Sequence, residues 1–156
     1  MIWYVLSLVI VVIDQGTKYF FSTQSFNEPY QVLPFLSFSH LCNSGAAFGF
    51  FAGMRWPLVA VGVIFVGYFS WEISKENRRE PRHLTLLLGY SLILAGALGN
   101  LIDRSLQGCV VDFIFLHYAQ YGFPVFNVAD IGISCGAALW IWSLLRGHPV
   151  KQSLES

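Results

Sequence analysis

The sequence predicts an all-α membrane protein with four transmembrane helices and a small β-rich cradle, which is made by the outer connections between the helices. Three observations carry this prediction. First, 55% of the 156 residues are hydrophobic and only 12% are charged, far from the balance of a soluble domain. Second, four stretches are apolar over the length that a hydrocarbon core requires, about 20 helical residues. Third, two longer connections carry strand-like patterns.

The four predicted spans are 1–21, 57–74, 84–104 and 127–145, each with approximate bounds. The first apolar run has no basic segment in front of it, and no small-residue cleavage site follows it before Asp14. It is therefore interpreted as a retained span and not as a removable signal peptide. No internal repeat or change of composition is visible, so we expect residues 1–156 to form a single membrane domain.

Positive charge gathers on one side of the predicted bundle. The link between the second and third spans and the tail after the fourth hold six of the nine Lys and Arg residues, namely Lys75, Arg78, Arg79, Arg82, Arg146 and Lys151. The positive-inside rule makes this side cytoplasmic and predicts that both termini are cytoplasmic. Basic and acidic residues number 9 each, so there is no basic excess of the kind that indicates nucleic-acid binding.

The two outer connections, about 22–56 and 105–126, are rich in aromatic residues, proline, serine and glycine. In the first, "YQVLPFLSFSHL" is typical of one or two short strands interrupted by Pro34. In the second, "CVVDFIFLHY" is β-branched and aromatic, which favours a strand. We expect a small sheet on the outer membrane surface.

Polar residues within the spans lie near their outer ends. Asp14 and Lys18 are one helical turn apart in the first span, in the order that favours an intrahelical ion pair, and the lysine stem can also snorkel outward. Helix anchoring is the simpler role for this pair. In the third span, Ala95 and Gly99 are spaced as two small residues that let another helix approach closely.

Asn100 and Arg104 follow on one face of the third span, and two interpretations of them stay open. In the first, Asp103 offsets the charge of Arg104 in an interfacial ion pair. In the second, Arg104 and Asn100 donate hydrogen bonds to a substrate carbonyl or to a catalytic carboxylate. Asn43, within the small-residue run "CNSGAAFGFF", can cap a short helix or bond to an extended peptide.

Two further acids stand out. Asp112 lies among apolar residues in "GCVVDFIF", either on the wet face of a strand or in a low-dielectric site that raises its pKa. Asn127 and Asp130 open the fourth span, where a capping box explains them by themselves. The residues that share this outer level are Asp14, Asn43, Asn100, Arg104, Asp112, Asn127 and Asp130. A capping box does not explain such a convergence, which indicates a functional site.

The chemistry that fits this site is acid–base catalysis by two carboxylates. One carboxylate can activate water while the other, holding a shared proton, protonates the developing oxygen, and Asp112 and Asp130 are the best placed. The four histidines are dispersed without metal-ligand spacing, so neither a metal nor a cofactor is expected.

The cysteine pattern indicates neither a disulfide framework nor a zinc site. Cys42, Cys109 and Cys135 form no CxxC pair and are odd in number, and they are interpreted as small apolar residues. A bridge between Cys42 and Cys109 is conceivable if both lie on an oxidising side.

Five short motifs carry a resemblance to a known family. In order and spacing, "DQGTK" (14–18), "NSGAAFG" (43–49), "GNLIDR" (99–104), "VVDF" (110–113) and "FNVADI" (126–131) resemble the motifs of the bacterial lipoprotein signal peptidase family, signal peptidase II. The resemblance implies an intramembrane aspartic endopeptidase with a catalytic pair at Asp112 and Asp130. It implies supporting roles for Asn43, Asn100, Arg104, Asn127 and Asp14.

The resemblance also implies partners and a location. The substrates are prolipoproteins that carry a diacylglyceryl group on a cysteine, and the cut falls just before that cysteine. The partners are then these signal peptides, membrane lipid and globomycin-type cyclic peptide inhibitors, in the bacterial inner membrane with the site near the periplasmic face. The competing hypotheses are a small proton-coupled carrier, which needs titratable groups through the inner half as well, and a scaffold subunit with purely structural acids.

Overall fold

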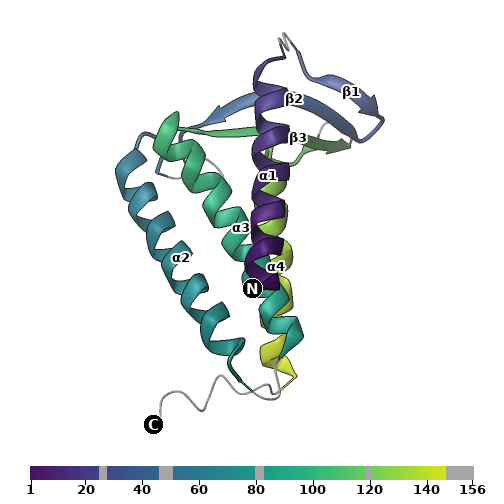
Figure 1. Ribbon diagram of the computed structural model, residues 1–156. Helices are drawn as coiled ribbons and strands as arrows, with labels where there is room; N and C mark the ends of the chain where they lie inside the picture. The colour runs from purple at the N-terminus through teal and green to yellow at the C-terminus, as the bar shows by residue number, and fades with distance from the viewer. Residues whose placement is uncertain (25–27, 46–50, 80–82, 119–120, 147–156) are drawn as a thin grey trace.

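The computed structural model describes residues 1–24, 28–45, 51–79, 83–118 and 121–146. Four helices run side by side, and a sheet covers one end of the bundle (Figure 1). They are α1 (Ile2–Ser22), α2 (Arg55–Glu76), α3 (Leu84–Leu106) and α4 (Val128–Leu145). All four are long and apolar enough to cross a membrane, which confirms the predicted spans. We call the two ends of the bundle the sheet end and the distal end.

Helix α3 lies at the centre of the bundle. It buries 67% of its most apolar stretch, whereas α2 buries 11%. Glycines allow its close contacts. A Cβ at Gly96 would collide with the backbone of Ala129 in α4, and one at Gly136 would lie 2.6 Å from a carbonyl oxygen of α3. Gly99 faces α1, where the Asp14 side chain fills the space that a Cβ would need. The prediction that Gly99 lets a helix approach is therefore confirmed.

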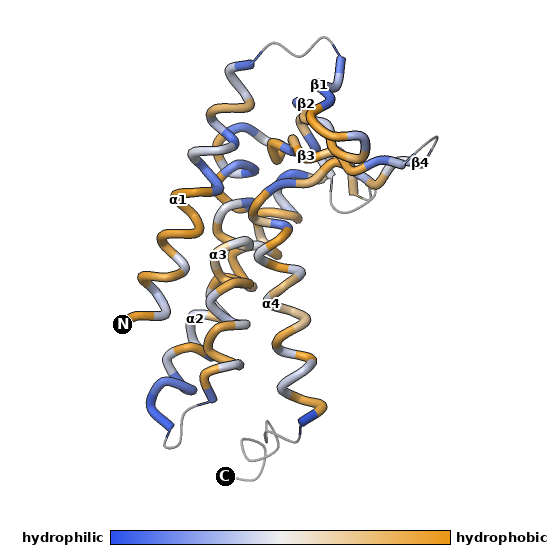
Figure 2. Tube along the Cα trace, turned by 90° about the vertical axis from the view of Figure 1, so that its right-hand side faces the viewer, coloured by the Kyte–Doolittle hydropathy of each residue, from blue (hydrophilic) through white to orange (hydrophobic). Residues whose placement is uncertain are grey.

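The distal end is held together by apolar and aromatic packing. Its buried cluster consists of Phe69, Ile73, Leu86, Leu87, Tyr90, Ile93 and Leu94. Trp140 of α4 packs edge-on against Phe69 of α2, with ring centroids 5.8 Å apart. The trace is mostly hydrophobic along the helices and more hydrophilic toward the sheet and at the end of α2 (Figure 2).

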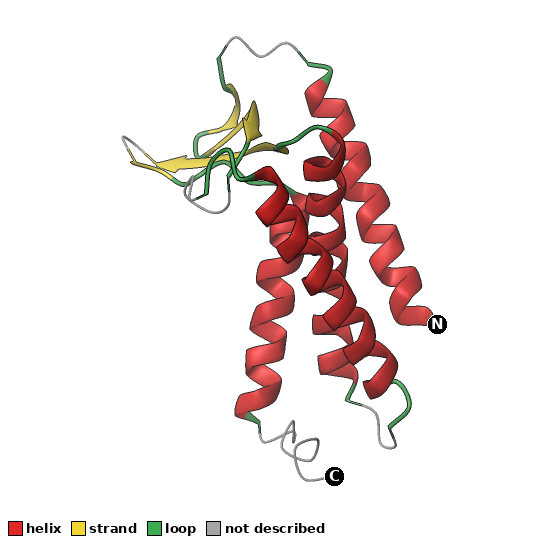
Figure 3. Cartoon of the chain, turned by 90° about the vertical axis from the view of Figure 1, so that its left-hand side faces the viewer, coloured by secondary structure: helices red, strands yellow, loops and turns green. Residues whose placement is uncertain are grey.

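The sheet at the other end, yellow in Figure 3, has four antiparallel strands. Their order is β1-β2-β3-β4. Their bounds are β1 (Tyr30–Leu33), β2 (Leu36–Asn43), β3 (Val110–Tyr118) and β4 (Tyr121–Gly122). Pro34 falls between β1 and β2, as the sequence indicates. Phe21 near the end of α1 stacks on Phe113 of β3 with centroids 4.3 Å apart, so the sheet is packed against the bundle.

Strand register decides which side chains reach the bundle. The pairing of β2 with β3 is irregular between Phe38 and Leu41, after which Leu41 opposes Asp112 and Asn43 opposes Val110. Opposed residues of an antiparallel pair share a face, and so do residues two apart. Asn43 therefore lies on the same face as Asp112.

The chain that enters α4 is tied to β3 as well. The backbone N–H of Ile114 donates to the carbonyl of Phe126 at 2.8 Å, and the N–H of Phe126 donates back to Ile114 at 3.0 Å. This two-way bond brings the start of α4 beside the middle of β3. Asn127 and Asp112 become neighbours as a result.

Candidate active site

A cavity of about 310 Å³ lies where the sheet meets the ends of α3 and α4. Five of the seven predicted site residues line it, namely Asn43 of β2, Asn100 and Arg104 of α3, Asp112 of β3 and Asp130 of α4. Much of the remaining wall is apolar and comes from residues 123–126. The cavity thus gathers polar groups from two helices and two strands inside an apolar frame.

Asn127 contacts both carboxylates of the cavity. Its Nδ2 donates to Asp112 Oδ1 at 2.6 Å, and its backbone N–H donates to Asp130 Oδ2 at 3.3 Å. Its Oδ1 accepts from the backbone N–H of Asp130 at 3.0 Å, which completes the predicted capping box. The capping box is therefore present, and the residue that starts it also joins the two acids.

Each carboxylate receives a second amide donor. Asn43 Nδ2 donates to Asp112 Oδ2 at 2.9 Å, and Asn100 Nδ2 donates to Asp130 Oδ1 at 2.9 Å. These donors are neutral amides, which hold a carboxylate in place with less stabilisation of its charge than a bonded cation would give. Two carboxylates held in this way can share a proton.

Asp112 lies in a low-dielectric environment. Its exposed fraction is 2%, and its pKa is raised to about 6, mainly by burial. The negative charge of Asp130 contributes to this rise, while the bonds from Asn43 and Asn127 and the charge of Lys18 oppose it. Of the two readings of Asp112, the buried one is confirmed, so the carboxyl can keep a proton at a pH where an exposed aspartate has lost it.

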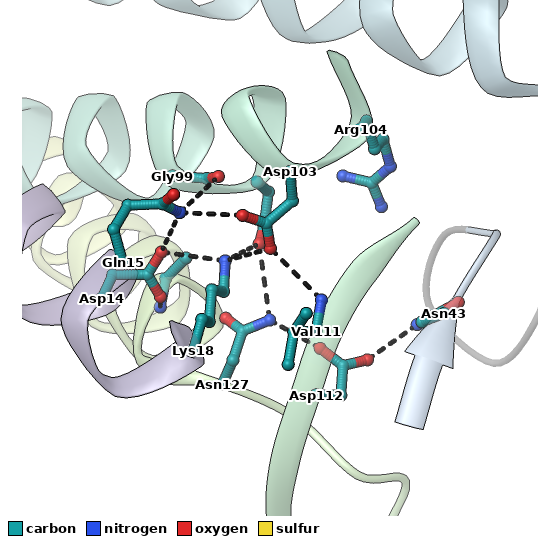
Figure 4. A network of polar contacts seen from close by, with 12 residues as sticks. Asp14, Gln15, Lys18, Asn43, Gly99, Asp103, Arg104, Val111, Asp112 and Asn127 are labelled. Carbon is teal, nitrogen blue, oxygen red and sulfur yellow. Dashed lines mark hydrogen bonds and ion pairs between the residues drawn. The ribbon is translucent and has the colours of Figure 1, made fainter. Parts of the chain in front are cut away.

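Arg104 does not pair with Asp103, so that interpretation is wrong. Its Nη2 donates to the carbonyl oxygen of Gly45 at 2.8 Å, and the side chain lines the cavity. Asp103 points elsewhere (Figure 4), because consecutive helical residues project about 100° apart. The Nε of Arg104 has no hydrogen-bond partner among the described residues. The guanidinium thus lies at the cavity wall with its Nη2 bonded to Gly45.

An ion cluster of Asp14, Lys18 and Asp103 is buried behind the cavity (Figure 4). Lys18 Nζ lies 2.8 Å from Asp14 Oδ2 and 3.0 Å from Asp103 Oδ2, and none of the three residues is more than 3% exposed. The predicted pair of Asp14 and Lys18 is confirmed. The lysine, however, does not snorkel outward, because Asp103 of α3 holds it inside the bundle.

Gln15, Lys18 and Asp103 were not predicted as site residues, although they surround the site from behind. Gln15 Nε2 donates to Asp103 Oδ1 at 2.8 Å. The signal that could have found them is spacing. Gly99, which makes room for Asp14, is one turn before Asp103 on α3, so both face α1 and its polar residues.

Cys42 and Cys109 form a disulfide. The bridge that the sequence left conceivable is therefore present, and the interpretation of the two cysteines as small apolar residues is wrong. Asn43 of β2 opposes Val110 of β3, and the two cysteines directly precede these residues on the opposite face of the strands. Their proximity follows from strand register, which cysteine spacing does not reveal. Cys135 is free and exposed.

Comparison with known proteins identifies a family and several relatives that this chain resembles. Residues 6–146 match the family model of signal peptidase (SPase) II. The lipoprotein signal peptidase of Pseudoalteromonas translucida is 37% identical, over 97% of this chain and 93% of its own length. That of Polynucleobacter necessarius is 40% identical, over 90% of this chain and 87% of its own.

Solved structures agree in fold as well as sequence. A bacterial membrane enzyme determined by the in meso method at 2.3 Å superposes with a TM-score of 0.83 at 33% identity, covering 99% of this chain and 93% of that one. A second, determined at 1.9 Å, gives a TM-score of 0.79 at 34% identity and covers 92% of each chain.

Proposed function

Because this chain belongs to the signal peptidase II family, it is a protease that removes lipoprotein signal peptides, and we propose that Asp112 and Asp130 are its catalytic pair. One observation carries the assignment. Both carboxylates line one cavity, and a single buried residue, Asn127, bonds to each of them. The supporting residues are Asn43 and Asn100, which supply the remaining amide donors.

The proposed reaction is the hydrolysis of one peptide bond by acid–base catalysis. Asp130, as a carboxylate, takes a proton from water, and the water oxygen attacks the carbonyl carbon just before the lipidated cysteine. Asp112 gives its proton to the carbonyl oxygen, so a neutral diol forms. The C–N bond then breaks as the cysteine nitrogen takes the proton from Asp130. Asp112 recovers its proton from a diol hydroxyl, which leaves the enzyme as it began.

The resting proton is assigned to Asp112. Its carboxyl is buried and its pKa is raised to about 6, whereas Asp130 is half-buried at the cavity wall and thus within reach of water. Because one group must be ionised and the other protonated, we expect a bell-shaped pH profile whose limbs belong to the pair and not to either aspartate alone.

The substrate class follows from the family and is supported by a second hollow. This apolar hollow of about 220 Å³ lies between α2, α3 and α4, and it shares Asn100, Arg104 and Ile133 with the cavity. A signal peptide placed there would bring its apolar part along the helices and its scissile bond to Asp130. The diacylglyceryl tails of the cysteine would stay in the bilayer at the same depth. Arg104 is positioned to donate to a substrate carbonyl.

The orientation proposed is cytoplasmic termini and a periplasmic sheet end, in the bacterial inner membrane. The cation distribution supports it, and so does the disulfide at the sheet end, because disulfides persist in oxidising compartments such as the periplasm. Single cysteines placed at Arg78 and Gln31 in a Cys135→Ser background test it. A membrane-impermeant thiol reagent should label only the second from outside, and the reverse pattern would invert the orientation.

The decisive experiment is cleavage by the purified protein in lipid. A precursor carrying the diacylglyceryl cysteine should be cut just before that cysteine, as mass spectrometry of both products would establish. The same precursor without the lipid should remain uncut. A globomycin-type cyclic peptide should inhibit the reaction by occupying the cavity. Equal cleavage of both precursors would show that the lipid is not recognised, and no cleavage of either would refute the function.

A further inference from the structure

We propose that Lys18 is a positioning residue for the catalytic pair, because its ammonium group fixes the Asn100 amide in the orientation that bonds to Asp130. This inference rests on the proposed roles of Asp112 and Asp130. Lys18 does not contact the carboxylate of Asp112 or that of Asp130. It acts through Asn100, and its own place is fixed by the ion cluster defined above.

The coordination of the ammonium group is complete. Lys18 Nζ donates to Asp14 Oδ2 at 2.8 Å, to Asp103 Oδ2 at 3.0 Å and to Asn100 Oδ1 at 2.9 Å. An ammonium group has three donors and no acceptor, so all three donors are used and only an oxygen can face it. The amide of Asn100 must therefore present Oδ1 to Lys18, which turns its Nδ2 toward Asp130 Oδ1 at 2.9 Å.

Without the ammonium group, the orientation of Asn100 would be open. A side-chain amide has similar shape with its oxygen and nitrogen exchanged, and neighbouring donors decide between the two. In the exchanged orientation, Asn100 would direct its oxygen at the carboxylate of Asp130, and the two acceptors would repel. Asn127 Nδ2 lies 3.4 Å from Asn100 Oδ1, which is a much longer contact than that of Lys18. The short ionic bond is thus the main determinant.

The carboxylates that hold Lys18 also hold the backbone next to both catalytic residues. Asp14 Oδ1 accepts from the N–H of Ala129 at 2.8 Å, one residue before Asp130. Asp103 Oδ2 accepts from the N–H of Val111 at 3.2 Å, one residue before Asp112. The ion cluster therefore contacts three elements, α3, β3 and α4, at the points where they carry the site.

Charge provides a readout that structural support alone would not change. Lys18 pairs with Asp14 of α1 and Asp103 of α3. The charged groups that act on Asp112 are Lys18, Asp130 of α4 and Arg104 of α3. The positive charge of Lys18 lowers the pKa of Asp112, although burial dominates. Removing that charge should therefore raise the pKa of Asp112 and move the high-pH limb of the rate profile to higher pH.

The test compares Lys18→Met with Lys18→Arg and with the control Lys75→Met, in which a lysine at the distal end that packs on the Trp71 ring is lost. For Lys18→Met, kcat should fall by about 10- to 100-fold, as expected for a lost charge-assisted bond, with KM little changed. The high-pH limb should move to higher pH, because the lost charge lowered the pKa of Asp112. Lys18→Arg should keep the parental limb, and Lys75→Met should match the parent throughout.

The position of a limb does not depend on how much of a preparation is folded, so the test separates positioning from stability. A folded Lys18→Met enzyme with parental kcat and limbs would overturn the proposal. If that variant does not fold, Lys18→Met combined with Asp103→Asn, which keeps the net charge of the cluster, replaces it. For this double variant kcat is the criterion, because the limb should stay near its parental position, and a parental kcat would overturn the proposal. Failure of every Lys18 variant to fold would assign the lysine to folding and also overturn the proposal. An inactive parent enzyme would instead refute the proposed function.

Discussion

The sheet end and the distal end of the bundle differ in how much charge they bury. At the distal end, the central cluster is aliphatic and aromatic, and the buried charge among the described residues is confined to Glu76, which pairs with Arg79 and His83. At the sheet end, Asp14, Lys18, Asp103 and Asp112 are each no more than 3% exposed. Buried charge is costly unless it is paired and fully hydrogen-bonded. The distal end thus contributes mainly apolar packing, whereas the sheet end bears the cost of burying charge around the proposed catalytic pair.

Helix α3 joins the two ends. Leu87, which is fully buried in the distal cluster, and Asn100, which bonds to Asp130, are 13 residues apart on it, or about 20 Å along a straight helix. None of the residues of the apolar cluster lines the cavity. Substitutions at each end should therefore separate activity from stability.

The largest expected effect is on activity at the sheet end. Asp112→Asn and Asp130→Asn should each lower the cleavage rate by about 100- to 10,000-fold, because asparagine neither takes up nor delivers a proton. Thermal unfolding in detergent should change little for Asp130→Asn, since the new amide oxygen can still accept the N–H of Asn127 and keep the helix cap. Rapid cleavage by a folded Asp130→Asn protein would remove Asp130 from the catalytic pair.

The next effect is on stability at the distal end. Leu87→Ala should lower the free energy of unfolding by about 2 to 5 kcal/mol, because it leaves a cavity in a packed region. At a temperature where the variant stays folded, kcat should equal that of the parent. Leu145→Ala is the matched control, because that leucine is 79% exposed. A fall in kcat for folded Leu87→Ala would show that the two ends are not separable.

The disulfide lies at the sheet end but outside the residues that line the cavity. Replacing Cys42 and Cys109 with serine should cost about 2 to 4 kcal/mol of stability while substantial activity remains in the folded fraction. Cys135→Ser should have neither effect, because that cysteine is unpaired and exposed. A reductant should lower the unfolding temperature of the parent but not of the double variant. Equal responses in both would mean that the bridge contributes nothing.

The smallest effect is a change in proton affinity. Infrared titration of the Asp112 carboxyl should give a pKa of about 6. Asn43→Ala should raise this pKa, because the lost amide bond stabilised the carboxylate. Asp130→Asn should lower it, because a neighbouring negative charge disappears. If Asp112 ionised at the pH of an exposed aspartate, more water would reach it than its burial indicates.

The sequence was sufficient for the elements and for the convergence of the site. Four spans follow from length and apolar composition. The strands follow from their β-branched and aromatic residues, and Pro34 separates two of them. These signals are local in the sequence. The level shared by Asp112, Asp130 and the asparagines followed from topology. None of this required knowing which side chains touch.

The contacts that were missed depend on orientation and register. Asp103 and Arg104 are neighbours in sequence but point to different partners, since the rotation of α3 is set by its packing on α1 and α4. The inward direction of Lys18 depends on Asp103 from another helix. The bridge between Cys42 and Cys109 was only conceivable from the sequence, because it depends on the strand pairing. Each of these contacts depends on tertiary structure, which local patterns in a single sequence do not reveal.

The order of the elements along the chain has a consequence for biogenesis. During synthesis, α1 enters the membrane first and carries Asp14 and Lys18 before α3, with Asp103 and Asn100, has been made. The i,i+4 spacing of Asp14 and Lys18 lets the two charges neutralise each other in the meantime. Asp112 reaches its place only after α3, and Asp130 arrives with α4, the last helix to be translated. A ribosome-bound chain that lacks α4 thus lacks Asp130 and has not assembled the proposed catalytic pair.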